Sequence, residues 1–131
     1  MKNNPRITKK ERGLLKGAIR RVFHRSELRL QAVKQSMVTH SDPSRPRVKK
    51  WSKCFECHEL IPTYLMEIDH EHPIVPVDMA TEDMSLDDIV DNCWCPIEYL
   101  HALCEKCHRE KTSVERKLRV LFRSTKKGNK V

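Results

Sequence analysis

The sequence is poor in the residues that build a large hydrophobic core. Only 38% of its 131 residues are hydrophobic, and only 5% are aromatic. The chain is therefore long enough for one domain but too short for two well-packed ones. A core of this size needs additional stabilisation, which a structural metal ion can supply directly as folding free energy.

Long apolar runs are also missing. No segment approaches the roughly 20 apolar residues of a membrane-spanning helix, so we expect no membrane association. The N-terminal residues up to Arg6 are not followed by the apolar run of a secretory signal. We therefore expect a cytoplasmic protein, in which C-x-x-C cysteine pairs are more typical of metal binding than of disulfides.

The charge falls into three blocks of alternating sign. Residues 1–50 hold 15 Lys or Arg and 3 Asp or Glu (+12), residues 51–103 hold 1 and 12 (−11), and residues 104–131 hold 10 and 3 (+7). The total is +8. Basic ends around an acidic middle are typical of a chain that binds a polyanion electrostatically.

Residues 1–50 are expected to form a basic helical arm followed by a linker. Thr8 and Glu11 have the spacing of a capping box at the start of a first helix. Ser26 is suited to cap a second helix. In residues 38–50, two prolines stand among Ser, Arg and Lys, which indicates a linker.

The rest of the chain alternates between strand, turn and helix patterns. Apolar residues 60–68 are rich in strand formers, and residues 99–103 predict a second short strand. Residues 74–92 form an acidic insertion with one short helix. A final helix is expected from residue 105 to about 123, followed by a basic flexible tail at 124–131.

Four of the six cysteines form two C-x-x-C pairs: Cys54, Cys57, Cys104 and Cys107. Four thiolates are the usual ligand set of a closed, tetrahedral structural zinc site. Cys93 and Cys95 are further potential donors, but we favour buried free thiols beside Trp94. The sequence thus predicts one structural Zn²⁺ that joins two segments far apart in the chain.

Residues suited to catalysis lie in the same two segments as these cysteines. Asp69 precedes His70 at the expected end of the first strand, and His108 directly follows Cys107. Because carboxylate oxygen and imidazole both bind divalent metals, Asp69 and His108 could share a second ion with open coordination positions. His70 would then be free to act as a base, since its ordinary pKa of about 6.5 lies near working pH.

Together these elements resemble the HNH endonucleases, which have the ββα-metal fold, and in particular phage-type members with a zinc-binding cysteine quartet. The resemblance covers the two cysteine pairs, Ile68-Asp69-His70 with Pro73, and the run 103–112. It implies an α+β fold, with a small ββα-metal (HNH) core stapled by a four-cysteine zinc site and preceded by the helical arm. Residues 51–123 would be the nuclease domain.

The resemblance also implies roles for the site residues. Asp69 and His108 would hold a catalytic divalent ion, Mg²⁺ or Mn²⁺, with Ni²⁺ and Zn²⁺ as alternatives. His70 would be the general base that deprotonates the attacking water, and Arg109 and Lys111 would be candidates for phosphate contact or for orienting the site. The substrate would be DNA, cleaved to 5′-phosphate and 3′-hydroxyl ends. The protein would act in the cytoplasm of a bacterial host if it is phage-encoded.

One position departs from the family pattern. Tyr99 stands where the family carries an Asn that braces the loop of the general base. Tyr99 itself or Asn92 could take over this support, and His72 is a further ligand candidate, although we favour a solvent-facing loop histidine. Two other functions stay open: a catalytically weak or inactive zinc-stapled nucleic-acid-binding module, and an accessory nuclease subunit of a phage packaging or recombination complex.

Overall fold

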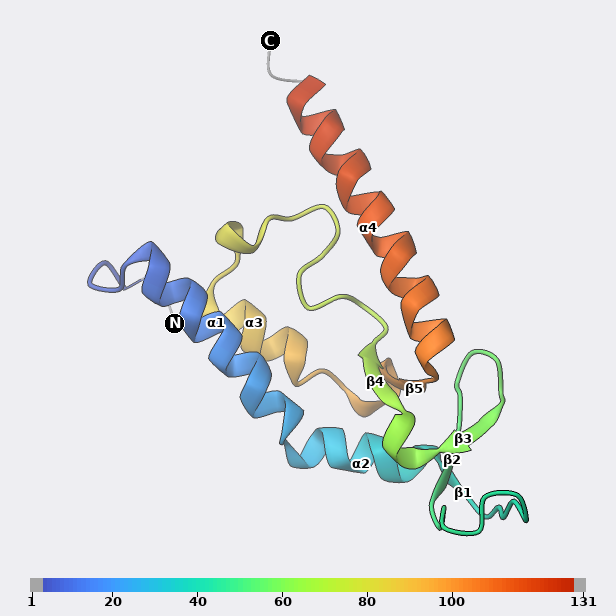
Figure 1. Cartoon of the computed structure of the whole chain (residues 1–131). Helices are drawn as coiled ribbons and strands as arrows, with labels where there is room; N and C mark the ends of the chain where they lie inside the picture. The colour runs from blue at the N-terminus through green and yellow to red at the C-terminus, as the bar shows by residue number, and fades with distance from the viewer. Residues whose placement is uncertain (1–3, 129–131) are drawn as a thin grey trace.

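The chain folds into four α-helices and two small antiparallel sheets within residues 4–128, the part that the computed structural model describes, with side chains as far as residue 125 (Figure 1). The helices are α1 (Lys9–His24), α2 (Glu27–Ser36), α3 (Leu86–Cys93) and α4 (Glu105–Gly128). The strands are β1 (Met37–Val38), β2 (Trp51–Lys53), β3 (Leu60–Pro62), β4 (Glu67–His70) and β5 (Leu100–Leu103). One sheet has the order β1-β2-β3 and the other pairs β4 with β5. The predicted α+β class is confirmed.

Both N-terminal helices begin at the expected caps. The Thr8 hydroxyl accepts a hydrogen bond from the N–H of Glu11, whose carboxylate accepts one from the N–H of Thr8. Ser26 caps α2 by accepting from the N–H of Arg29. Near the end of α1, Phe23 is buried, so the basic arm packs onto the body of the protein along α3 (Figure 1).

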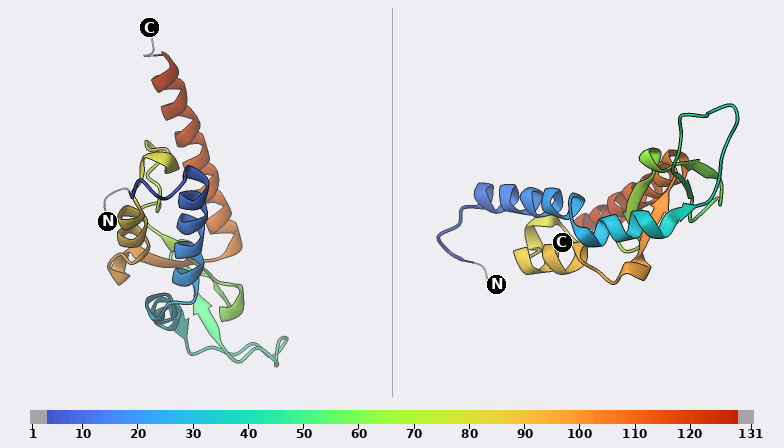
Figure 2. Two further views of the ribbon diagram at one scale, coloured as in Figure 1. Left: turned by 90° about the vertical axis from the view of Figure 1, so that its left-hand side faces the viewer. Right: turned by 90° about the horizontal axis from the view of Figure 1, so that it is seen from below.

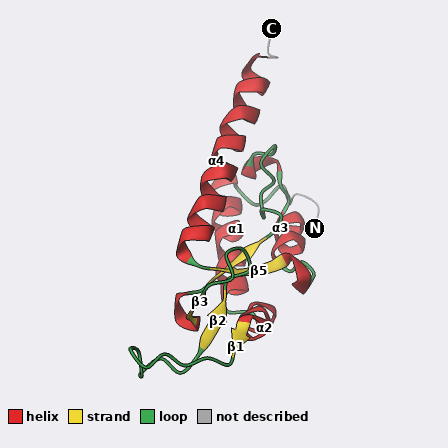
Figure 3. Ribbon diagram, turned by 90° about the vertical axis from the view of Figure 1, so that its right-hand side faces the viewer, coloured by secondary structure: helices red, strands yellow, loops and turns green. Residues whose placement is uncertain are grey.

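The expected linker is the loop between two paired strands. Residues 39–50 lie outside helices and strands and project away from the rest of the chain (Figures 2 and 3). On either side of this loop, β1 and β2 pair antiparallel, with Val38 opposite Trp51. Trp51 is only 3% exposed and belongs to the hydrophobic core.

The strand predicted over residues 60–68 is interrupted. β3 pairs with β2 in the first sheet, a 3-10 turn follows at Thr63–Leu65, and β4 pairs with β5 in the second sheet. Beyond Pro62, the N–H of Thr63 still donates to the carbonyl of Lys50, and the 3-10 turn then carries the chain from the first sheet to the second. The prediction was wrong about the length of the strand, but Asp69 and His70 do lie at the end of β4.

Residues predicted as an acidic insertion contribute to the main core. Ser85 and Asp88 form a capping box at the start of α3, and the apolar face of this helix points inward. Ile89 and Cys93 are both 0% exposed and pack in one cluster with Phe23 of α1. α3 therefore packs against α1 with its apolar face, while its acidic residues face solvent.

α4 starts directly after β5 and is the longest helix among the described residues. Its C-terminal half extends beyond the rest of the chain (Figures 1 and 2). The helix continues to Gly128, through most of the expected flexible tail, and residues 129–131 of that tail lie outside the described part. None of the described helices is both long and apolar enough to cross a membrane.

Candidate active site and metal centre

The four cysteines of the two C-x-x-C pairs lie together. Cys54 follows β2, Cys104 follows β5, and Cys107 lies in the first turn of α4. Their Sγ atoms, with that of Cys57, all lie within 4.8 Å of one another, and the Sγ atoms of Cys57 and Cys104 are 3.8 Å apart. Four Zn–S bonds of about 2.3 Å place the sulfur atoms about 3.8 Å apart in a tetrahedron. The quartet is therefore compatible with a structural zinc site.

Backbone N–H groups point at these sulfur atoms. The N–H of Cys104 donates to Cys54 Sγ, and the N–H of Cys107 donates to Cys104 Sγ, both over 3.4 Å. The turn that carries Cys54 and Cys57, the first knuckle, ends at His58. The φ of His58 is 64°, in the left-handed region, and its N–H donates to the Cys54 carbonyl. His58 thus shapes the knuckle through its backbone and belongs outside the ligand cluster.

The thiols of the cluster strongly influence one another. Burial acts to raise the pKa of Cys54, but hydrogen bonds from the backbone of Cys104, Cys57 and Glu56 outweigh it and lower that pKa to about 7. The thiol of Cys104, together with burial, raises the pKa of Cys107. Thiols this crowded can all become thiolates only where a cation compensates their charge, which is what zinc does.

Cys93 and Cys95 do not join the quartet. Among the described residues they belong to no group of three or more potential metal ligands. Cys93 is 0% exposed in the core below α1 and Cys95 is half-buried, and burial raises the pKa of both thiols. This arrangement agrees with the interpretation of packed free thiols.

The structure brings Asp69 and His108 together. Asp69 lies near the end of β4, and His108 lies one turn into α4, which turns back towards β4 after β5. The Nε2 atom of His108 is 3.7 Å from Oδ1 of Asp69. Two ligand atoms that each lie about 2.1 Å from a shared ion are at most about 4.2 Å apart. The two side chains can therefore share one divalent ion.

Lys111 completes this group from the next turn of α4. Its ammonium lies 2.7 Å from Oδ2 of Asp69, pairs with Glu115, and donates to the backbone carbonyl of His70 over 2.9 Å. Burial acts to lower the pKa of Lys111, but Asp69 and Glu115 outweigh it and raise that pKa. Lys111 therefore stays charged and balances two carboxylates at the site.

His70 lies on the other face of β4 from Asp69, as expected for adjacent strand residues. Its ring is buried against Phe23, with 4.8 Å between ring centroids, and its Nε2–H donates to the carbonyl of Cys93 over 2.9 Å. Burial lowers the pKa of His70, although the Cys93 carbonyl and Asp69 act in the opposite direction. The imidazole is thus predominantly neutral near pH 7.

Asp69, His70 and His108 line one cavity of about 230 Å³. Its remaining walls come from the loop after β4, from α4 and from α1. Three of its charged residues were not anticipated from the sequence: Arg20, Glu115 and Arg119. Of these, Glu115 and Arg119 carry a local signal, since they follow His108 and Lys111 at helical spacing. Arg20 reaches the cavity through the packing of α1, which no local pattern encodes.

The other predicted site residues have distinct positions. The side chain of Asn92 donates to the carbonyl of Ile74 and so supports the loop after His70. Tyr99 accepts from the N–H of Glu71 through its backbone carbonyl. His72 points to solvent with its side chain 78% exposed, in agreement with the favoured interpretation.

Arg109, predicted to contact phosphate, does not line the cavity. It is paired with Glu105 one turn earlier in α4, and its side chain is 75% exposed.

No family model, curated protein or solved structure matches this chain. The functional proposal therefore rests on the positions of the side chains within this structure.

Proposed function

We propose that this protein is a metal-dependent HNH endonuclease that hydrolyses DNA phosphodiester bonds and carries a structural zinc in the cysteine quartet. One observation carries the proposal. Asp69, His70 and His108 line the same cavity, next to a quartet that fits zinc. Two antiparallel strands followed directly by a helix, β4-β5-α4, form the scaffold, which matches the order of a ββα-metal unit.

Asp69 and His108 would hold the catalytic ion, Mg²⁺ or Mn²⁺ in the first instance. Their 3.7 Å separation suits a shared ion, and the donor set of one carboxylate and one imidazole leaves positions open for phosphate oxygens. A bound divalent ion supplies Lewis-acid stabilisation of the charge that develops on phosphate and leaving oxygen. Lys111 adds a fixed positive charge beside Asp69.

His70 would accept the proton of the attacking water. The hydrogen bond from Nε2–H to the Cys93 carbonyl fixes the tautomer and leaves Nδ1 as the proton acceptor. Its neutral ring satisfies the requirement of a general base at neutral pH. The buried contact with Phe23 holds the ring in place, so little reorganisation is needed when substrate binds.

DNA is the favoured substrate because both basic blocks flank the site. α1 contributes Arg20 to the cavity wall, and α4 contributes Lys111 and Arg119. Electrostatic attraction of this kind supports binding of a nucleic-acid backbone independent of base sequence. The phage-type assignment, and with it the cytoplasm of a bacterial host, follows from the resemblance alone.

Metal-screened cleavage of plasmid DNA tests the proposal. Purified protein is incubated with supercoiled plasmid and Mg²⁺, Mn²⁺, Ni²⁺ or Zn²⁺. We expect nicking with at least one ion, and at least about a hundredfold slower nicking by His70→Ala, the usual loss of a general base. His24→Ala, which removes an exposed histidine of α1, is the matched control and should cleave at the parental rate. If His70→Ala cleaves as fast as the parent, the assigned mechanism is wrong.

A zinc-stapled nucleic-acid-binding module is the second candidate. It is motivated by Tyr99 at the family's Asn position and by Lys111, which already neutralises Asp69. It predicts salt-sensitive DNA binding without cleavage in any of the four metals.

An accessory nuclease subunit of a phage packaging or recombination complex is the third candidate, since α3 presents Asp88 and Asp91 to solvent as a potential docking face. It predicts cleavage only with a partner present.

A further inference from the structure

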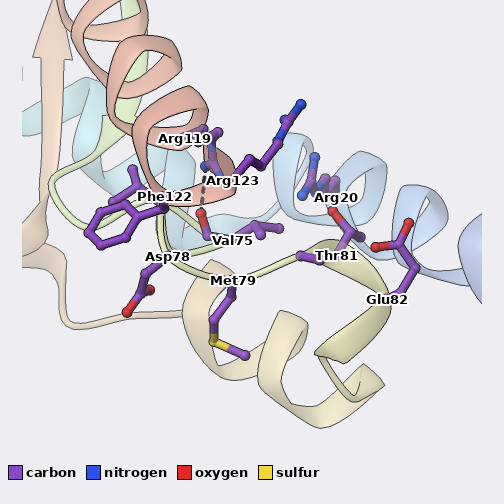
Figure 4. A pocket seen from close by; sticks show the side chains of 11 residues that line it. Arg20, Val75, Asp78, Met79, Thr81, Glu82, Arg119, Phe122 and Arg123 are labelled. Atoms are coloured by element: carbon purple, nitrogen blue, oxygen red, sulfur yellow. Dashed lines mark hydrogen bonds between the residues drawn. The ribbon is translucent and has the colours of Figure 1, made fainter. Parts of the chain in front are cut away.

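A second, larger cavity lies beside the proposed active site. Its volume is about 630 Å³, and it lies between α1 and α4 above the loop of residues 75–82. Three arginines line it, Arg20 from α1 and Arg119 and Arg123 from α4 (Figure 4). Because Arg20, Val75 and Arg119 also line the 230 Å³ cavity, the two spaces share a border. Together they form a groove that leads outward from Asp69 and His108.

The floor of this groove is held at both ends. Arg119 donates to the carbonyls of Val75 and Pro76, which attaches the start of the loop to α4. Lys16, only 4% exposed, donates to the carbonyl of Thr81 and attaches the other end to α1. Two basic side chains are thus used to fix the loop, and the groove keeps its shape without a ligand.

The other two arginines are left without partners. Within the described part of the chain, neither Arg20 nor Arg123 forms a hydrogen bond or an ion pair, and both are exposed. Asp78 and Glu82 also line the cavity, and neither pairs with them. In Figure 4, Arg20 and Arg123 lie on one side of the loop backbone together with the carboxylate of Glu82, and Asp78 lies on the other. With three arginines and one carboxylate lining it, this side of the groove has a net positive charge.

We propose that this groove binds the DNA backbone phosphates next to the scissile bond, with Arg20 and Arg123 as their direct contacts. A guanidinium group matches the oxygens of a phosphate with two parallel hydrogen bonds, which favours arginine at such positions. Arg20 borders both cavities, so it contacts the phosphate nearer the site, and Arg123 contacts one further along the strand. This inference rests on the proposed function, because it takes the groove as the path of the substrate.

Salt-dependent binding of a short fluorescent DNA duplex tests the groove directly. Protein that holds one equivalent of bound zinc is titrated at several salt concentrations without any free divalent metal, so that the proposed catalytic site stays empty. Each phosphate contact contributes about one to the slope of log affinity against log salt. We expect Arg20→Ala and Arg123→Ala each to reduce the slope by about one, and the double variant by about two.

Two variants serve as matched controls. Arg21→Ala in α1 and Arg116→Ala in α4 remove the same charge from exposed positions of the same helices, and neither residue lines either of the two cavities that form the groove. They should leave the slope nearly unchanged. All four side chains are exposed, so substitutions should change stability by no more than about 0.5 kcal/mol. If the controls weaken binding as much as the groove variants do, contact with DNA is diffuse and the groove assignment is overturned.

The cleavage assay separates failure of the groove from failure of the proposed function. With a functional groove, Arg123→Ala should raise the DNA concentration needed for half-maximal cleavage at least threefold and leave kcat unchanged, whereas His70→Ala lowers kcat. Groove-dependent binding without cleavage in any metal would reject the nuclease function and retain the groove. Cleavage with unaltered half-saturation in Arg123→Ala would reject the groove and retain the nuclease.

Discussion

The ammonium of Lys111 lies 2.7 Å from Oδ2 of Asp69, whereas Nε2 of His108 lies 3.7 Å from the other oxygen, Oδ1. Asp69 therefore has one oxygen neutralised by the protein itself and one facing the proposed ion ligand. An ion between Asp69 and His108 would share the carboxylate with Lys111. Lys111 and the proposed divalent ion would thus stabilise the same half-buried negative charge.

Loss of Lys111 should make stability depend on divalent metal. Lys111→Met leaves Asp69, whose side chain is only 16% exposed, without its cation and should cost about 2 kcal/mol in the absence of divalent ions. Mg²⁺ should then raise the Tm of this variant more than that of the parent. Lys117→Met, an exposed substitution on the same helix, is the control for the loss of charge. Equal Mg²⁺ shifts for all three proteins would show that Asp69 binds no ion.

The cysteine quartet should be required for folding, and the other cysteines should not. Cys104→Ser removes one of four clustered ligands, and structural zinc contributes on the order of 10 kcal/mol of folding free energy. We expect elemental analysis to find about one zinc per chain in the parent. Cys104→Ser should lose that zinc and its cooperative thermal transition. Cys95→Ser should retain both, and zinc loss in Cys95→Ser would assign the ligand set differently.

The acidic segment should be essential to the core rather than an appendage. Ile89 of α3 is 0% exposed, so Ile89→Ala should lower the free energy of unfolding by about 2–5 kcal/mol. Its neighbour Val90 is 39% exposed, and Val90→Ala should cost less than about 1 kcal/mol. Urea unfolding of both variants measures the difference. Similar small losses in the two would place α3 outside the cooperative core.

The buried thiol of Cys93 should add a pH dependence to stability. Burial raises its pKa in the folded protein, so the unfolded chain loses this proton at lower pH than the folded one. The contribution is complete below the unfolded pKa of about 8.5 and declines as pH rises above it. We expect the Tm of the parent to fall more between pH 8 and pH 10 than that of Cys93→Ala. Parallel Tm curves would mean that the thiolate is tolerated in the core.

Features coded by short-range patterns were predictable from the sequence. The caps at Thr8, Ser26 and Ser85 depend on residues three positions away, and the cysteine spacing defines each metal knuckle locally. The switch of sheets after Pro62 was missed, because the apolar run 60–68 has no feature that tells one pairing partner from two.

The cavity walls were predictable only in part. Asp69 and His108 could be paired in advance because a shared zinc ion would join the two segments that contain them, each of which carries one cysteine pair. Arg20 could not, since its position depends on how α1 packs against the loop after β4. Nor did the acidity of residues 74–92 reveal that the apolar face of α3 completes the core.

The periodicity of α4 has a consequence for residues that touch neither cavity. Lys111, Glu115 and Arg119 follow one another at intervals of four along this helix, and Arg123 continues the row. Adding a single residue within the exposed stretch 116–118 would turn everything beyond it by about 100° and carry Arg119 and Arg123 off the groove wall. Adding four would nearly restore the angle but move both arginines outward by about 6 Å. The number of residues in the stretch 116–118 is thus constrained more tightly than the identity of their side chains.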